Sequence, residues 1–485
     1  MRLLRSAFIF LICSLLVLSC DERPLDPPGG NGTEGNGSAV DSVPQKQENK
    51  DKYGLEYLYD GKTVPEFHID VSIDQWNTLL GYYDKDRNTK KHVKCNVRYV
   101  KGGEETVVTD AALRLRGNTS RRRPEGNGGQ KHVAGSTAWH HCHFQVNFHK
   151  NVKDSLHKVH GAKKVVLKWF KDDPTYVREL YCYDLFRRAG IWTAANSAYC
   201  RLYLKVDGDP KEAYYGIYNM IEPIDETYLK ARKASFSSAD GFLWKCRYGA
   251  GLSTTNADFG ADLDDGREHV YELKTHTDSL AQATAQMKDF ITKLNSLEGE
   301  QFRTWITQVC DVPLLMKTYA VNVAVGMWDD YWNNCNNYYI YFNSTDKSSY
   351  KFYFIPFDYD NTLGTSSNCG VQSDSGRQDP FNWGDKRNPL IAKLLGFDEF
   401  REVYKQELLR LVTPVNKLMD FESSRQRILD WQRMIDGMTP NDTGEDQVIT
   451  DRPASWGNHG EYRLVENSSN NYFSVKAETV RKYCL

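Results

Sequence analysis

The sequence predicts an α+β protein in which a sheet-rich half of the chain precedes a mostly helical half. Up to about residue 225, short segments rich in β-branched and aromatic residues are separated by turn residues, which is the pattern of strands. Beyond that point, helical segments dominate. Tyrosine is unusually common, at 29 of 485 residues, which also favours a large sheet. The formal net charge of −2 excludes a global field that attracts nucleic acid or acidic membranes.

The first fifty residues are interpreted as a targeting segment and a tether. Residues 1–19 have a charged start and a short apolar stretch, too short to span a membrane and typical of a signal peptide. The stretch ends in Leu-Val-Leu-Ser-Cys20, which resembles the lipobox of bacterial lipoproteins and implies lipidation of Cys20 after cleavage. Residues 20–50 are rich in Gly, Pro, Ser and charge, so we expect a flexible tether.

Residues 55–225 are expected to form the sheet-rich half. Asp172-Asp173-Pro174 is typical of a helix start, with Asp as the N-cap and Pro in the first turn. Segment 140–149 alternates like a strand, and we interpret its histidines as one solvent-exposed face rather than as a metal site. The expected strands are 67–72, 93–100, 107–116, 140–149, 164–170, 198–206 and 213–221, and the expected helices are 73–80 and 176–188.

Residues 226–485 are expected to form the helical half, interrupted by one hairpin whose strands are YYIYF and YKFYFIPF. Segments 232–277 and 366–388 are rich in Gly, Ser and Asp, and we interpret them as inserted loops on the substrate side. The aromatic residues Trp328, Tyr331, Trp332 and Trp383 are expected to pack in the core. The expected helices are 226–233, 278–296, 301–308, 312–326, 389–412, 421–436 and 475–483.

Acidic and amide side chains gather on both sides of this hairpin. A hairpin that returns carboxylates beside Asp and Asn side chains forms a hard, oxygen-rich site, which suits Mg²⁺ or Mn²⁺ bound with substrate phosphates. Taken singly, each residue could instead cap a strand or a turn; as a set they favour the metal site. The residues are Asp329, Asp330, Asn333, Asn334, Asn336, Asn337, Asp358 and Asp360.

Two basic features lie in the sheet-rich half. The segment Arg114-Leu-Arg116-Gly-Asn118-Thr-Ser120 joins a strand to a Gly-, Ser- and Arg-rich loop, which is either an anion cradle or a polar turn. Lys168 lies within a compact strand before a helix that carries Glu179. We predict that Lys168 contacts phosphates and that Glu179, or else Arg178, belongs to its charge network. The alternative is an exposed strand lysine and a surface glutamate.

In order along the chain, these motifs follow the plan of a protein-kinase-like fold with a sheet-rich N-terminal lobe and a mostly helical C-terminal lobe. Over about residues 65–480, the chain also resembles the spore-coat protein H (CotH) kinases, a divergent branch of that fold. Five motifs in the same order carry the resemblance. They are Arg114 to Ser120, Asp173 to Glu179, Tyr215 to Asp225, Asp329/Asp330 with Asn336 to Tyr341, and Ile355 to Gly364.

The resemblance implies an ATP-dependent protein kinase that uses Mg²⁺ or Mn²⁺. It implies that one of two neighbouring aspartates acts as the catalytic base, that carboxylates and amides after it hold the metal, and that the Arg-rich loop and the interlobe crossing contact the nucleotide. The implied base is Asp330 or Asp329. The implied metal residues are Asn336 or Asn337, Asp358 and Asp360, and the implied nucleotide residues are Arg116, Asn118, Ser120 and Glu222. Lys168 and Glu179 are added to the nucleotide residues because of their position along the chain.

We expect the acceptors to be Ser or Thr residues of exported proteins, with no nucleic-acid partner. The lipid on Cys20 is the expected membrane contact, at the outer membrane of the cell envelope, and Asp21 and Glu22 favour export toward the surface. One alternative is a catalytically silent scaffold or binding lipoprotein; another is transfer to a non-protein acceptor. Apart from Cys13 and Cys20, nine of the 11 cysteines remain, and we expect most of them to be buried thiols.

Overall fold

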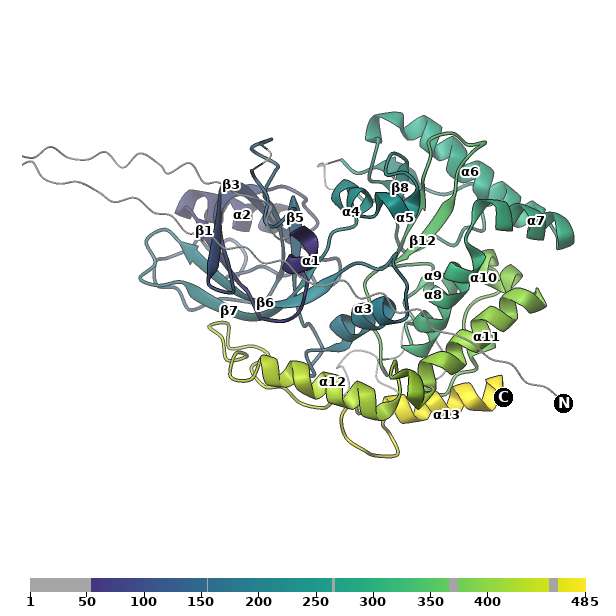
Figure 1. Ribbon diagram of the computed structural model, residues 1–485. Helices are drawn as coiled ribbons and strands as arrows, with labels where there is room; N and C mark the ends of the chain where they lie inside the picture. The colour runs from purple at the N-terminus through teal and green to yellow at the C-terminus, as the bar shows by residue number, and fades with distance from the viewer. Residues whose placement is uncertain (1–53, 155, 264–266, 366–373, 453–460) are drawn as a thin grey trace, which may run out of the picture. The chain divides into compact units, whose positions relative to one another are not determined.

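The computed structural model describes residues 54–485, except residue 155 and residues 264–266, 366–373 and 453–460. These residues form a mixed α+β protein, as the sequence predicts (Figure 1). The expected signal peptide, lipidated cysteine and tether lie outside the described residues. Among the helices that the structure describes, none combines the length and apolar character that a membrane crossing requires.

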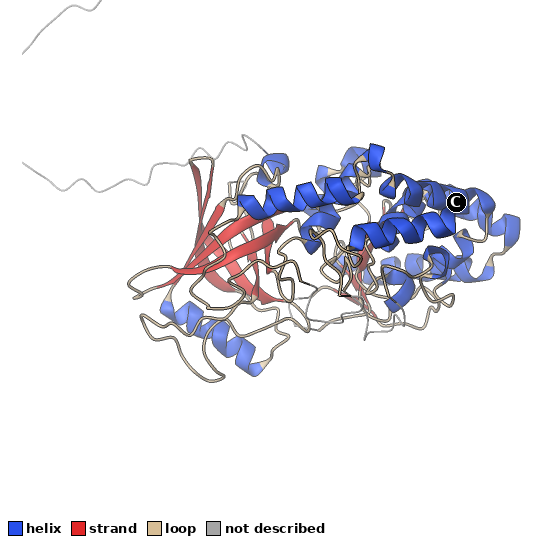
Figure 2. Ribbon diagram, turned by 90° about the horizontal axis from the view of Figure 1, so that it is seen from below, coloured by secondary structure: helices blue, strands red, loops and turns tan. Residues whose placement is uncertain are grey.

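The strands of the first half close into a barrel, with the order β1-β2-β3-β4-β5-β7-β6 (red in Figure 2). Closure occurs because β1 pairs antiparallel with β2 on one side and parallel with β6 on the other. The sequence patterns predict strands here but not their closure into a barrel. The strands are β1 (Glu66–Val71), β2 (Val93–Lys101), β3 (Glu104–Arg116), β4 (His143–Asn147), β5 (Lys164–Trp169), β6 (Ser197–Val206) and β7 (Ala213–Ile221).

In the described chain, the α-helices before and between the barrel strands are α1 (Gly54–Leu58), α2 (Ile73–Lys85) and α3 (Arg178–Arg188). The predicted start of α3 is wrong, because the helix begins at Arg178, whereas the expected range begins at residue 176 and the cap prediction places Pro174 in the first turn. The Asp173 carboxylate nevertheless caps the N-terminus of α3, although it lies several residues before the helix. It accepts hydrogen bonds from the backbone N–H groups of Val177 (3.1 Å) and Arg178 (2.9 Å), and it also pairs with the Arg178 guanidinium. Arg178 is therefore tied to Asp173 and does not replace Glu179.

A second sheet in the other half has the order β12-β11-β8-β10-β9. The interpretation of segment 232–277 as a loop is wrong, since it supplies three strands of this sheet. Its short apolar runs are buried when β8 pairs with the predicted hairpin, with Trp244 opposite Ile340. The strands are β8 (Phe242–Cys246), β9 (Phe259–Ala261), β10 (Tyr271–Leu273), β11 (Tyr338–Phe342) and β12 (Phe352–Pro356).

The predicted helices of this half are present with shifted ends. The predicted helix 389–412 is interrupted next to Gly396, so that α10 (Pro389–Leu394) and α11 (Asp398–Val412) are separate. Three further short helices are α4 (Glu226–Ala231), α5 (Lys233–Phe236) and α9 (Tyr331–Asn334). The other α-helices are α6 (Leu280–Ser296), α7 (Gly299–Val309), α8 (Val312–Ala324), α12 (Phe421–Met434) and α13 (Tyr472–Cys484), and the 3₁₀ turns are Thr277–Ser279, Pro380–Asn382 and Pro414–Asn416.

Two large apolar cores stabilise these halves, one inside the barrel and one between the second sheet and its helices. The aromatic residues expected in the core are there: Trp328, Tyr331, Trp332 and Trp383 are each at most 2% exposed. The described cysteines are free thiols, and all of them except Cys335 are buried. For the described cysteines, this confirms the expectation that most are buried thiols.

Candidate active site

The fold brings Lys168 to three carboxylates. The Nζ atom of Lys168, on β5, lies 2.9 Å from Oε2 of Glu179 on α3. It also lies 2.5 Å from Oδ1 of Asp358 and 3.0 Å from Oδ2 of Asp360, both of which follow β12. The predicted pair between Lys168 and Glu179 is thus present, and both side chains are buried. One ammonium facing three carboxylates leaves a net negative charge, which favours a further cation.

This cluster shifts the pKa values of its members. Burial opposes the charge on Lys168, but the carboxylates of Asp358, Asp360 and Glu179 outweigh it and raise the pKa of Lys168. Burial raises the pKa of Glu179 to about 7, against the opposing effect of Lys168, and it also raises the pKa of Asp360. Burial acts on Asp358 too, yet Lys168 and Arg116 outweigh it and hold the pKa of Asp358 below its usual range. Asp358 is therefore the carboxylate that stays ionised, as a metal ligand must.

Asp358 also has an unusual backbone conformation. Its φ angle is +65°, in the left-handed region that residues other than glycine seldom adopt and that recurs at functional sites. Its backbone N–H donates a hydrogen bond to the hydroxyl oxygen of Tyr183 on α3, at 3.1 Å. The same helix thus positions both Glu179 and the backbone of Asp358.

The two neighbouring aspartates before the hairpin have different environments. Asp329 lines the cavity, and its carboxylate accepts hydrogen bonds from the amides of Asn334 (2.5 Å), Asn336 (3.1 Å) and Asn337 (2.8 Å). Burial raises the pKa of Asp329 to about 6, although the amides of Asn334 and Asn336 oppose the shift.

Asp330 points into the protein instead. It is 3% exposed and caps α9 by accepting a hydrogen bond from the backbone N–H of Asn333 at 2.7 Å. Its other carboxylate oxygen accepts from the amide of Asn322 at 2.5 Å. Burial raises the pKa of Asp330 to about 7. Of the two candidates, only Asp329 is among the residues that line the cavity.

The Arg-rich loop begins where β3 ends, at Arg116. Gly117 has a φ angle of +111°, and a Cβ atom there would lie 2.8 Å from Oγ of Ser120, so the tight turn requires glycine. Arg87 holds the loop from outside, donating to the carbonyl oxygens of Thr119 (2.7 Å) and Arg121 (3.0 Å). The loop is therefore a fixed wall of the cavity.

Glu222 lies at the end of β7, where the chain crosses to the second half. Its carboxylate accepts hydrogen bonds from Arg232 at 2.7 and 2.8 Å and from the side-chain amide of Asn196 at 2.9 Å. Glu222 lines the cavity, but its oxygens are already bound within the protein. Its side chain therefore fixes the crossing segment.

One cavity of about 1110 Å³ brings most of the predicted residues together. Glu179 and Asp330 lie behind its wall, and a separate cavity of about 460 Å³ contains none of the predicted residues. The predicted residues that line the large cavity are Arg116, Asn118, Ser120, Lys168, Glu222, Asp329, Asn336, Asn337, Asp358 and Asp360.

His143 on β4 and His141 before it are not on a solvent face, so the prediction is wrong for these two histidines. His141 and His143 are 2% and 1% exposed. His143 lies against the Gly117 loop, and its Nδ1 atom accepts a hydrogen bond from the backbone N–H of Trp169 at 3.1 Å. An alternating pattern indicates two faces of a strand but does not show whether both are covered.

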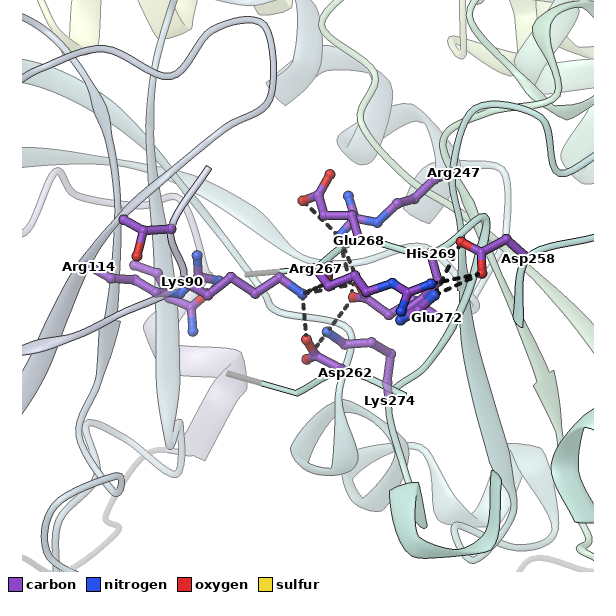
Figure 3. A network of polar contacts seen from close by, with 12 residues as sticks. Lys90, Arg114, Arg247, Asp258, Asp262, Arg267, Glu268, His269, Glu272 and Lys274 are labelled. Atoms are coloured by element: carbon purple, nitrogen blue, oxygen red, sulfur yellow. Dashed lines mark hydrogen bonds and ion pairs between the residues drawn. The ribbon is translucent and has the colours of Figure 1, made fainter. Parts of the chain in front are cut away.

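A charged network that the sequence did not indicate borders the cavity (Figure 3). Lys90, from the segment before β2, reaches Asp262 (3.0 Å) and Glu272 (3.1 Å) beside β9 and β10. Arg247 and Lys274 also pair with Glu272. The network therefore connects the barrel side of the cavity with the second sheet.

Lys245 on β8 is a second cavity residue that was missed. A signal was present, because Phe-Leu-Trp-Lys-Cys is an apolar strand with one lysine, like Val165-Val-Leu-Lys168-Trp. Because segment 232–277 was expected to be a loop, Lys245 was not considered as a strand lysine.

The described residues contain no group of three or more His, Cys, Asp or Glu side chains arranged as a metal site. The pair formed by Asp358 and Asp360 nevertheless shares one cation, the ammonium of Lys168. Carboxylate and amide oxygens are the donors that Mg²⁺ and Mn²⁺ prefer. The donor set fits such an ion.

The fold and cavity define a mixed α+β protein with a lysine–glutamate pair and acidic residues around one large cavity. The chain belongs to the CotH kinase protein family, whose family model matches residues 113–483. It is similar to inner spore coat protein H of Bacillus subtilis (strain 168), with 27% identity over 249 residues. That alignment covers 51% of this chain and 62% of the relative, less than two thirds of its length.

Proposed function

We propose that the protein is an ATP- and divalent-metal-dependent kinase that transfers phosphoryl groups to Ser or Thr residues of exported proteins. The observation that carries the proposal is the buried Lys168–Glu179 pair beside Asp358, in a cavity that Asp329 also lines. Phosphoryl transfer requires a cation on the phosphates, metal-binding carboxylates and a positioned base. Membership of a family named for kinases supports the same activity.

In this proposal the barrel, and the second sheet with its helices, are the two lobes of a kinase-like fold. The nucleotide lies in the cavity, with its phosphates against Arg116, Asn118 and Ser120. Glu222, held by Arg232, orients the crossing segment next to the adenine and ribose.

Asp358 and Asp360 would hold Mg²⁺ or Mn²⁺, with amide oxygens of Asn336 or Asn337 as further donors. A metal ion bound there neutralises charge on the phosphates and orients them. Glu179 keeps the ammonium of Lys168 directed toward the phosphate oxygens. Since Asp358 stays ionised at neutral pH, it retains the charge that this role needs.

Asp329 is the proposed base, in preference to Asp330. Its pKa of about 6 leaves it mostly ionised at neutral pH, so that it can accept or orient the proton of the acceptor hydroxyl. The amides of Asn334, Asn336 and Asn337 hold the carboxylate in place. Asp330 stabilises this loop by capping α9.

The proposed location is the cell envelope. Lipid on Cys20 would anchor the chain to the outer membrane, and the tether would hold the folded part in reach of exported protein acceptors. Nucleotide and acceptor protein are the proposed partners, and nucleic acid is not one of them.

Purified full-length protein should incorporate label from ATP carrying ³²P at the γ position, into itself or a casein-type acceptor, when Mg²⁺ or Mn²⁺ is present. Asp358→Asn should abolish labelling because it removes the ionised metal ligand. Asp346→Asn, an exposed aspartate on the β11–β12 connection, is the matched control and should label normally. Thermal unfolding should show that both variants are folded.

Absence of labelling with either metal would contradict the proposal and favour a catalytically silent scaffold or binding lipoprotein. Transfer of label from α-³²P-ATP, but not from the γ position, would favour nucleotidyl transfer.

A further inference from the structure

Two basic side chains that line the cavity differ from its other cations in their hydrogen-bond and ion-pair partners. Arg116 and Lys245 line it, and, within the part of the chain that the structure describes, no carboxylate or carbonyl oxygen lies within hydrogen-bond or ion-pair distance of either. The lining cations that pair with carboxylates are Lys90, Lys164, Lys168, Lys171, Arg247 and Lys274.

Both side chains contact one aromatic ring. The Cζ atom of Arg116 lies 5.7 Å, and the Nζ atom of Lys245 5.1 Å, from the ring centroid of Phe357, the residue before Asp358. The ring of Tyr339 packs edge-on against Phe357 with centroids 5.1 Å apart. Since Lys245 on β8 is the register partner of Tyr339 on β11, the second sheet fixes the position of Lys245.

Two neighbouring cations in a partly buried wall repel each other. Burial lowers the pKa of Lys245, and Arg247 and Arg116 lower it further. The cation–π contacts with Phe357 offset only a small part of such a cost. An oxyanion between Arg116 and Lys245 would offset it much more, because charge-assisted hydrogen bonds to phosphate are among the strongest in proteins.

We propose that Lys245 and Arg116 together bind the terminal phosphate of the nucleoside triphosphate. This inference rests on the proposed function and deepens it. Lys168 is tied to Asp358 and Asp360, whereas Lys245 lies beside the strand that begins directly after Asn337, whose amide holds Asp329. The phosphoryl group that moves to the acceptor must lie next to the base, and Lys245 is the cation supplied from that side.

Calorimetry with the full chain and Mn²⁺ can test the inference, using a non-hydrolysable ATP analogue, ADP and adenosine. Lys245→Met should weaken binding of the analogue by about tenfold to a hundredfold, affect ADP far less and leave adenosine unchanged, while Lys245→Arg should restore most of the loss. Lys288→Met is the matched control, because that exposed lysine contacts the Phe259 ring at 5.5 Å outside the cavity. It should bind all three ligands like the wild type.

Amine labelling of the wild-type protein, read by mass spectrometry, needs no variant. The analogue should protect Lys245, and adenosine should not. Unchanged affinity of Lys245→Met for the analogue, or no protection of Lys245, would overturn the inference while leaving the proposed function intact. Equal losses for the analogue and ADP would also overturn it, by assigning the contact to an inner phosphate. If the wild type binds no nucleotide, both the inference and the proposed function fail.

Discussion

Asp329 and Asp330 show how adjacent residues of one type acquire different tasks. The carboxylate of Asp329 lines the cavity, while that of Asp330 accepts a backbone hydrogen bond inside the protein. Left-handed φ angles at Cys335 (+52°) and Asn337 (+55°) turn the following loop back, so that its amides reach Asp329. Activity and stability should therefore separate between the two positions.

Asp329→Ala should lower kcat by about a hundredfold or more, because it removes the proposed base. It should lower the free energy of unfolding less than Asp330→Ala does, because the amides of Asn334, Asn336 and Asn337 that lose their acceptor line the cavity, where water can replace it. Asp330→Ala should lower the free energy of unfolding by about 1–3 kcal/mol, since it removes a helix cap and leaves the amide of Asn322 without its acceptor. Steady-state kinetics and denaturant unfolding of both variants provide the measurement. Full activity in Asp329→Ala would transfer the role of base to another residue.

At the scale of elements, the second sheet matters because its strands come from distant parts of the chain. Lys90 joins it to the barrel side through Asp262 and Glu272, and the side chain of Glu272 is fully buried. Lysine and arginine neighbours outweigh burial and lower the pKa of Glu272 to about 2. Loss of one cation therefore leaves ionised carboxylates poorly compensated.

Lys90→Met should lower the free energy of unfolding by about 2–4 kcal/mol. Lys94→Met is the matched control four positions later, where Lys94 and Asp110 are 65% and 52% exposed. That exposed pair should contribute less than about 1 kcal/mol. Denaturant unfolding at low and high salt checks both values, and equal small losses in the two variants would show that the network does not stabilise the fold.

Elements with local signals were predictable from the sequence, and long-range pairings were not. Lys168 and Glu179 lie on a strand and the next helix, so their order along the chain indicated the pair. Lys245 was missed because its environment depends on pairing with β11, far along the chain. His143 was misplaced because periodicity does not reveal that the Gly117 loop covers that face. The choice between Asp329 and Asp330 depended on left-handed turns that no residue pattern indicated.

At the scale of the whole molecule, we expect Lys476 on α13 to make stability depend on pH. It is 1% exposed, and its Nζ atom donates to the carbonyl oxygen of Ser375 at 2.5 Å. Burial lowers its pKa from 10.5 to about 7. Between these pH values the unfolded chain holds one more proton than the folded protein, so the free energy of unfolding should rise with pH.

Unfolding at pH 7.5 and at 9.5 should show this rise in the wild type, by up to about 1.4 kcal/mol per pH unit. Lys476→Met should remove it and be more stable than the wild type near neutral pH, because no charge is buried. Lys482→Met, exposed on the same helix, should keep the wild-type slope. A wild-type slope in Lys476→Met would assign the pH dependence to other groups.

The parallel pairing of β1 with β6 has a consequence for the order of events in folding. Glu66 on β1 and Arg201 on β6 are ion-paired partners 135 positions apart. A growing chain that appears from its N-terminus first can pair β1 with β6 only after β6 has emerged, up to Val206. It cannot complete the ring until β7, which joins β6 to β5 and ends at Ile221, has followed. Ring completion is thus a late, high-contact-order step, and before β6 emerges β2 is the barrel neighbour with which β1 can pair.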